Sequence, residues 1–92
     1  MERRLGSAMA AKLAQRIAEL LGVESLADLA LLPGPRCHEL GADRDGQISL
    51  DLIHPMRLII EPTDDPPPTK TDGGLDWKRV TAVVIVEIVD TH

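Results

Sequence analysis

Three basic side chains in the second half of the chain could bind a phosphate or another anion. Arg57 lies in an otherwise apolar segment, and arginine binds phosphate oxygens through paired hydrogen bonds. Arg36 and His38 are two residues apart, so on a strand they would share one face and form an anion-binding patch. A structural interpretation of Arg57 is also open, in which it forms an ion pair with Glu61 on the same face or with Asp51 on a neighbouring strand.

The chain ends in Asp90-Thr91-His92, directly after its most apolar segment. The end of a strand can place side chains at the mouth of a cleft, where a histidine is suited to acid–base chemistry. The structural alternative is a solvated terminal histidine without a chemical role. Both interpretations stay open from the residues alone.

Two features of the sequence invite a metal-site interpretation, but neither has the ligands that a site needs. Residues 43–49, Asp-Arg-Asp-Gly-Gln-Ile-Ser, match the middle of a calcium-binding EF-hand loop. In that register Gly41 and Leu52 occupy the two anchoring positions that need carboxylates, so a hairpin turn is predicted instead. The single cysteine, Cys37, precedes His38, and adjacent strand residues point to opposite faces. We therefore predict no metal and no cofactor.

Two helices are expected in the first third of the chain. From Ser7 to Leu21 apolar residues recur every three or four positions, and polar residues, Arg16 among them, fall on the opposite face. A second, shorter helix is expected after Ser25, which together with Asp28 resembles a capping box. Pro33-Gly34-Pro35 ends it.

Beyond this point the apolar residues alternate with a period of two, which predicts an antiparallel sheet. The candidate strands cover residues 36–40, 47–52, 56–61 and 81–89. Residues 62–74 are expected to form a loop, because three consecutive prolines cannot enter the interior of a sheet. Residues 75–79 are expected to form one helical turn. Because residues 82–86 are apolar on both faces, we predict that the last strand is central in the sheet.

The composition describes one small domain, residues 1–92, with a thin aliphatic core. Trp77 is the only aromatic residue, so burial against a partner or a second copy is an expected source of further stability. The formal net charge of −5 argues against a free-standing nucleic-acid binder but leaves room for a local basic patch. A single cysteine fits the cytoplasm. No apolar run reaches the roughly 20 residues that span a membrane, so no membrane contact is expected.

Five segments of the chain carry a resemblance to a known family. They are LPGPRCHEL (32–40), DRDGQISLDL (43–52), HPMRLIIEP (54–62), DGGLDWKRVT (72–81) and EIVDTH (87–92). In this order and spacing they resemble the HigB-like killer toxins of the RelE/ParE superfamily, which belong to bacterial type II toxin–antitoxin modules. The resemblance is strong over the last two-thirds of the chain and loose over its helical first third.

The resemblance implies an α+β fold with N-terminal helices packed on a twisted antiparallel sheet of about four strands. It implies an mRNA interferase, an endoribonuclease that cuts messenger RNA on the ribosome without a metal. It further implies a cognate antitoxin of the helix-turn-helix HigA type. In this reaction the ribose 2′-hydroxyl attacks the adjacent phosphate, assisted by an acid, a base and cations.

The same resemblance assigns roles to individual residues. His92 matches the C-terminal histidine of the family, and Arg57 matches a basic residue on its third strand. Together with Asp90 they are the catalytic candidates, whereas Arg36 and His38 are candidates for binding the substrate.

Two departures from the family pattern support a second hypothesis. The family ends in Asp-Tyr-His, whereas Thr91 stands in the middle position here, and threonine cannot stack on a base. The family also begins with a strand that would precede the start of this chain, which predicts a sheet edge without that strand. Together with the acidic charge, these departures favour a catalytically impaired toxin-like protein that binds an antitoxin or regulates the module. An unrelated small α+β interaction domain is the third hypothesis.

Overall fold

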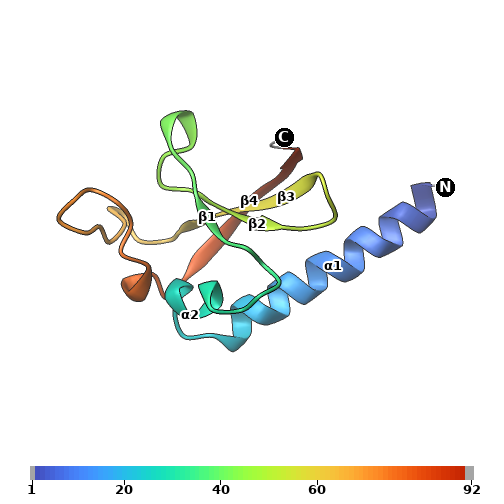
Figure 1. Ribbon diagram of the computed structural model, residues 1–92, viewed down its shortest axis with the longest axis horizontal. Coiled ribbons are helices and arrows are strands. Elements are labelled where there is room, and N and C mark those ends of the chain that lie inside the picture. Colours follow the sequence, from blue (N-terminus) through green and yellow to red (C-terminus); the bar gives the residue numbers. More distant parts are fainter. Residues whose placement is uncertain (1, 91–92) are drawn as a thin grey trace.

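The protein is an α+β structure in which helices lie on one side of an antiparallel sheet (Figure 1). The computed structural model describes residues 2–90, with side chains for residues 6–41 and 43–90. The helical elements are α1 (Glu2–Gly22), α2 (Leu26–Ala30), η1 (Ala42–Arg44) and η2 (Trp77–Arg79). The strands are β1 (His38–Glu39), β2 (Ile48–Asp51), β3 (Met56–Pro62) and β4 (Val83–Asp90), in the order β1-β2-β3-β4. The predicted α+β layout is confirmed.

The two helices are close to those predicted from the sequence. Helix α1 begins at Glu2 rather than at Ser7, and its N-terminal end projects beyond the sheet (Figure 1). The short helix α2 is capped by Ser25, whose hydroxyl oxygen accepts a hydrogen bond from the backbone N–H of Asp28 at 3.3 Å. A serine at this position satisfies one of the backbone donors that every helix leaves unpaired at its start.

The core lies between the helices and the facing side of β2 and β3. Ile48, Leu50, Leu58 and Ile60 have no exposed surface, and Leu29 of α2 is equally buried. Their spacing of two along each strand is the alternation that the sequence predicted. Part of the α1 apolar stripe packs against this core. Helices α1 and α2 therefore cover the same face of the sheet.

The predicted position of the last strand is wrong. Within the described sheet, β4 has a neighbouring strand on one side only, β3, and is therefore an edge strand. Its apolar side chains are exposed by 39–47%, at Val84, Ile85, Val86 and Ile88. A run of apolar residues on both faces is typical of a central strand, but it is equally expected of an edge that another surface covers.

The predicted position of Arg16 on the polar face of the first helix is also wrong. Arg16 is only 3% exposed. Its Nε donates to the backbone carbonyl of Asp51 at 2.6 Å, and its Nη2 donates to the carbonyl of Gly34 at 3.0 Å. Its Nη1 forms an ion pair with Glu19 at 2.9 Å. One buried guanidinium thus joins α1 to the loop before β1 and to the end of β2.

The close approach of Arg16 also explains the glycine between the two prolines. A Cβ at position 34 would lie 3.2 Å from Arg16 Nη1, which is tighter than ordinary van der Waals contact. A glycine at this position lets the loop backbone come within hydrogen-bonding distance of the guanidinium.

The long loop between β3 and β4 is held to β1 by one side chain. The carboxylate of Glu39 accepts a hydrogen bond from Trp77 Nε1 and another from the backbone N–H of Leu75, both at 3.0 Å. Leu75 is buried at the edge of the core. The helical turn predicted over residues 75–79 is the shorter η2.

Within residues 2–90, no helix has both the length and the apolar character that crossing a membrane requires.

Candidate functional site

The side of the sheet opposite α1 and α2, called the outer face below, brings together several candidate residues. Arg57 of β3 alternates with the buried Leu58 and therefore points away from the helices. In the strand register Arg57 lies opposite Asp51 of β2, and His38 of β1 lies opposite Ser49. Directly opposed residues of antiparallel strands share a face, so these four side chains belong to the outer face.

Arg57 is held in place by β2. Its Nη1 lies 3.0 Å from the Asp51 carboxylate and donates to the Ser49 hydroxyl at 3.3 Å. The side chains of Arg57 and Asp51 are 30% and 23% exposed. The sequence suggested two ion-pair partners for Arg57, and in the structure the partner is Asp51. Glu61 instead accepts a hydrogen bond from Gln47 at 3.1 Å.

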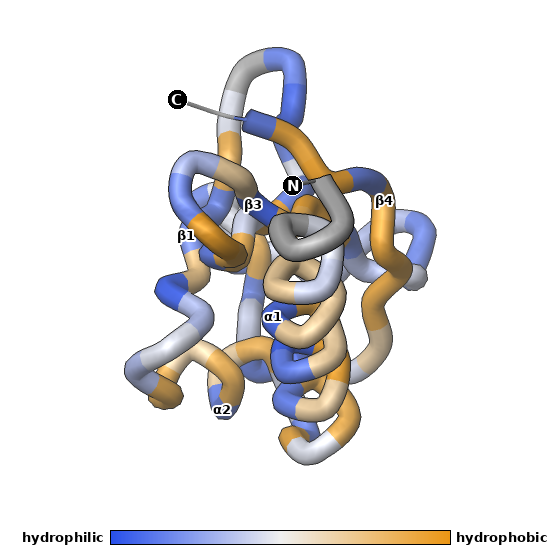
Figure 2. Tube along the Cα trace, turned by 90° about the vertical axis from the view of Figure 1, so that its right-hand side faces the viewer, coloured by the Kyte–Doolittle hydropathy of each residue, from blue (hydrophilic) through white to orange (hydrophobic). Residues whose placement is uncertain are grey.

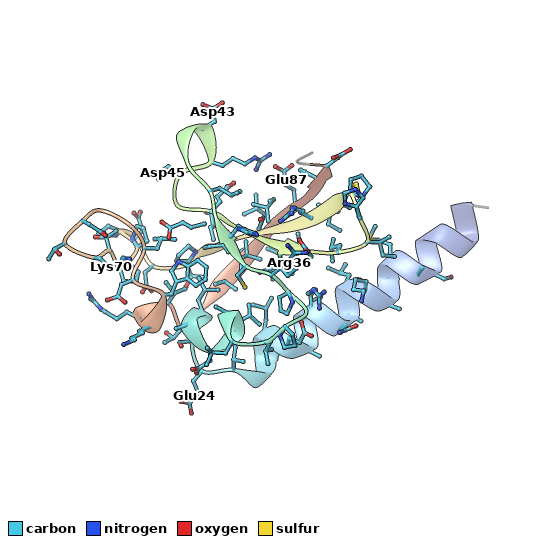
Figure 3. The ribbon with its side chains drawn as sticks, in the orientation of Figure 1. Glu24, Arg36, Asp43, Asp45, Lys70 and Glu87 are labelled. Carbon is cyan, nitrogen blue, oxygen red and sulfur yellow. The ribbon has the colours of Figure 1, made fainter. Side chains whose placement is uncertain are left out.

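Arg36 reaches the same carboxylate from the opposite side of β2. Its Nε lies 3.6 Å from Asp51 Oδ2, and its side chain is 69% exposed (Figure 3). The backbone of Arg36 has a φ of 50°, a left-handed conformation that is uncommon outside glycine. This conformation occurs directly after the Pro-Gly-Pro loop, where the chain turns onto the sheet. Arg36, Asp51 and Arg57 form a cluster with one net positive charge, called the Arg–Asp–Arg cluster below.

A second polar network crosses the outer face, and no pattern in the sequence predicted it. Arg44 of η1 reaches across to Glu87 of β4 at 2.6 Å and donates to Gln47 at 3.0 Å. Figure 3 labels Glu87 near the C-terminal end of β4. The ion pair joins residues that are 43 positions apart, a separation that local periodicity cannot reveal. Arg44 belongs to the calcium-like segment, which forms the predicted turn between β1 and β2.

The structure brings together some of the predicted site residues and separates others. Arg57, Arg36 and His38 share the outer face. Asp90 lies opposite Met56 in the register, whereas Arg57 lies opposite Val89, so Asp90 belongs to the helix-facing side of β4. Arg57 and Asp90 therefore lie on opposite sides of the sheet. His92 lies outside the described residues.

No group of three or more His, Cys, Asp or Glu residues in the described part of the chain is placed to hold a metal ion. The exposed side-chain donors of the outer face are guanidinium and imidazole groups, whereas the Ser49 hydroxyl is buried and accepts a hydrogen bond from Arg57. Guanidinium groups bind phosphate and carboxylate oxygens, so the chemistry of this face is anion binding.

Cys37 follows Arg36 but packs against the core instead of facing the Arg–Asp–Arg cluster. Burial raises the pKa of the Cys37 thiol from 9.0 to about 11, although the nearby Arg16 charge acts in the opposite direction. The thiol rather than the thiolate is therefore present at neutral pH. Because the thiolate is the nucleophile, Cys37 is not suited to act as one.

We expect Cys37 to react with a disulfide reagent about a hundredfold more slowly in the folded chain than in the chain unfolded in urea, at pH 8. The neutral thiol stabilises the fold fully below pH 9, and this contribution is lost as the pH rises through about 11. The release of the coloured thiolate measures the rate. Equal rates in the two states would contradict the burial of this thiol.

Comparison of the chain with family models, with curated proteins and with solved structures finds no match in any of the three. The function is therefore inferred from the residues and from the geometry of the outer face.

Proposed function

We propose that this chain is the toxin of a bacterial type II toxin–antitoxin module, with a RelE/ParE-type fold, and that it cleaves messenger RNA on the ribosome. The observation that carries the proposal is the Arg–Asp–Arg cluster, which places two guanidinium groups on the same face of the sheet as His38. The order of the five family-like segments supports the same class of protein. The protein would act in the bacterial cytoplasm.

The proposed reaction needs a cationic site for the scissile phosphate. Arg57 contacts Asp51 and Ser49 through Nη1, and its other two nitrogens carry further N–H groups that can donate to phosphate oxygens. Arg36 is more exposed and can close on the phosphate from the other side of Asp51. As the 2′-hydroxyl attacks, negative charge grows on the phosphate oxygens, and both guanidinium groups stabilise it.

Proton transfer is assigned to histidine in this proposal. His92 would exchange a proton with the 2′-hydroxyl or the leaving oxygen, since its ordinary pKa lies near neutrality. His38 lies in the row of Ser49 and Ile59 and would contact the bound RNA. No step of the reaction requires a metal.

Induction of the chain in bacterial cells tests this function. Growth arrest, accompanied by new 5′ ends within transcripts, is expected for the wild-type chain and not for His92→Ala at equal expression. Absence of arrest would contradict the toxin assignment, and arrest that His92→Ala leaves unchanged would contradict the catalytic role of His92.

Two observations favour a second function, that of a catalytically impaired protein that binds an antitoxin or regulates the module. The guanidinium of Arg57 is already engaged by Asp51, and the chain as a whole is acidic. A substrate phosphate must therefore compete with a carboxylate for Arg57. Under either function the proposed partner is a helix-turn-helix antitoxin, so binding of that partner does not separate the two, whereas the cleavage assay does.

A further inference from the structure

The exposed edge of the sheet is an apolar surface that the proposed reaction does not use. Strand β4 presents Val84, Ile85, Val86 and Ile88 with 39–47% of each side chain exposed. Figure 2 shows this strand as a strongly hydrophobic segment beside α1. A long apolar edge strand is a template for pairing with another strand, and native proteins ordinarily protect such an edge with charges or a cover.

A groove adjoins this edge on the helix side. It has a volume of about 350 Å³ and is lined mainly by apolar side chains from the end of α1, from α2 and from the start of β4. Ile17 and Leu20 of α1 form one wall, and Val83 and Ile85 of β4 form the other. A strand added beside β4 would therefore place its helix-side residues next to an apolar surface.

The pairing of β4 with β3 shows to which side of the sheet each β4 side chain belongs. Ile85 and Ile88 lie opposite the buried Ile60 and Leu58, so both belong to the helix side. Val84 and Val89 lie opposite Glu61 and Arg57 and belong to the outer face. Ile85 and Ile88 can share a side because the register shifts at a bulge between Ile59 and Ile60.

A second copy of β4, related by a two-fold axis between residues 86 and 87, matches this pattern. Antiparallel pairing about that axis places Ile85 opposite Ile88 of the second copy, on the helix side, and it does so twice by symmetry. It also places Val84 opposite Val89 of the second copy, on the outer face. Apolar residues thus meet apolar residues of the same face at four positions.

The bulge favours a second copy over a regular strand from another protein. A bulge shifts the alternation of faces by one residue, so a partner strand without a bulge would match only one half of β4. The second copy has its own bulge, and the two-fold axis lies beside it. The residues of β4 on both sides of the bulge therefore lie opposite residues of the second copy that point to the same face.

Charge is compatible with this self-pairing. Glu87 lies next to the axis, but it is already paired with Arg44 of its own chain at 2.6 Å. In the proposed register Glu87 meets Val86 of the second copy, and Asp90 meets Val83. No carboxylate lies directly opposite another across the interface. The two Glu87 residues are diagonal neighbours across the axis, and the Arg44 of each chain offsets the repulsion between them.

We infer that the chain forms a symmetric dimer by antiparallel pairing of β4 with β4 of a second copy, which joins the two sheets into one continuous eight-stranded sheet. This inference does not rest on RNA cleavage, because neither Arg57 nor His92 takes part in the pairing.

Sedimentation velocity over a series of concentrations tests the dimer. The wild-type chain is expected to sediment as a dimer that dissociates on dilution. Ile85→Lys is expected to raise the dissociation constant about a hundredfold, because it buries a charge at the centre of the interface. Leu31→Lys is the matched control: Leu31 is 82% exposed but lies at the end of α2, and this variant is expected to dimerise like the wild type.

A cross-link tests the register separately from the strength of association. In a Cys37→Ala background, the double variant Val84→Cys, Val89→Cys is expected to form a covalent dimer on mild oxidation, whereas neither single variant does. A wild-type chain that stays monomeric at all concentrations would overturn the inference. A dimer that Ile85→Lys leaves intact, or one in which the double variant forms no cross-link, would overturn it as well. The circular dichroism of each variant confirms that it is folded, and the cross-link decides the case if Ile85→Lys is unfolded.

Discussion

Arg16→Ala is expected to lower the free energy of unfolding by about 3 kcal/mol, a large fraction of the stability of a chain of this size. The substitution removes hydrogen bonds to the carbonyls of Asp51 and Gly34 and the ion pair with Glu19. Because Arg16 is 3% exposed, water cannot readily replace those bonds. An unsatisfied buried polar group carries its full desolvation penalty.

Urea denaturation followed by circular dichroism measures this effect, with Gln15→Ala as the matched control. Gln15 precedes Arg16 on α1 but is exposed, and its hydrogen bonds join it to neighbours on the same helix. Its replacement should change the stability by about 0.5 kcal/mol or less. Similar losses for the two variants would show that Arg16 contributes through helix propensity alone. They would contradict its role in joining the helix to the sheet.

The burial or the structural role of a residue was predictable where it depends on residues close to it in the sequence. The alternation around Ile48 and Leu50 identified the core side of β2, because a period of two on a half-buried strand reports burial directly. Ser25 was predictable as a helix cap for the same local reason. The burial of Arg16 was not predictable, since its carbonyl partners lie 18 and 35 positions away and a helical pattern places every charge on the solvent side.

The position of β4 shows a different limit of sequence patterns. Apolar residues on both faces of a strand indicate that both faces are buried. The pattern does not distinguish a central strand of the sheet from an edge strand that another molecule covers. The pattern at Val84, Ile85 and Val86 was therefore correctly identified as a strand and wrongly placed at the centre of the sheet. The exposed edge is better explained by the dimer proposed above.

The candidate site was predictable only in part. Asp51 was expected as a partner of Arg57, because the alternation and the short turn between their strands limit the possible registers. Asp90 and Arg57 were both named as catalytic candidates, but the sequence did not indicate that the two lie on opposite sides of the sheet. A difference of one residue in register moves a side chain to the other face. Because β4 is apolar on both faces, its sequence does not show which residues point to which side, so its register with β3 could not be predicted to one residue.

Under the proposed function, Arg57→Ala is expected to slow RNA cleavage by about 10²–10³-fold, the usual effect of removing one donor to a developing oxyanion. Loss of His92 would slow it by about 10²–10⁴-fold, as for a general acid or base. Cleavage of a defined messenger RNA on purified ribosomes measures both. Arg44→Ala is the matched control, since it removes the same charge from the outer face while leaving the contacts of Asp51 intact.

Asp51→Asn separates a phosphate site from a structural ion pair, because the two roles predict different effects on KM. Asp51 neutralises part of the charge on Arg36 and Arg57, so its loss should strengthen RNA binding and lower KM if those arginines hold a phosphate. If the cluster only stabilises the sheet, the same change should lower the stability and leave KM unaltered. Equal losses of activity for Arg57→Ala and Arg44→Ala would show that cleavage depends on overall charge, and the role of Arg57 as the phosphate ligand would be contradicted.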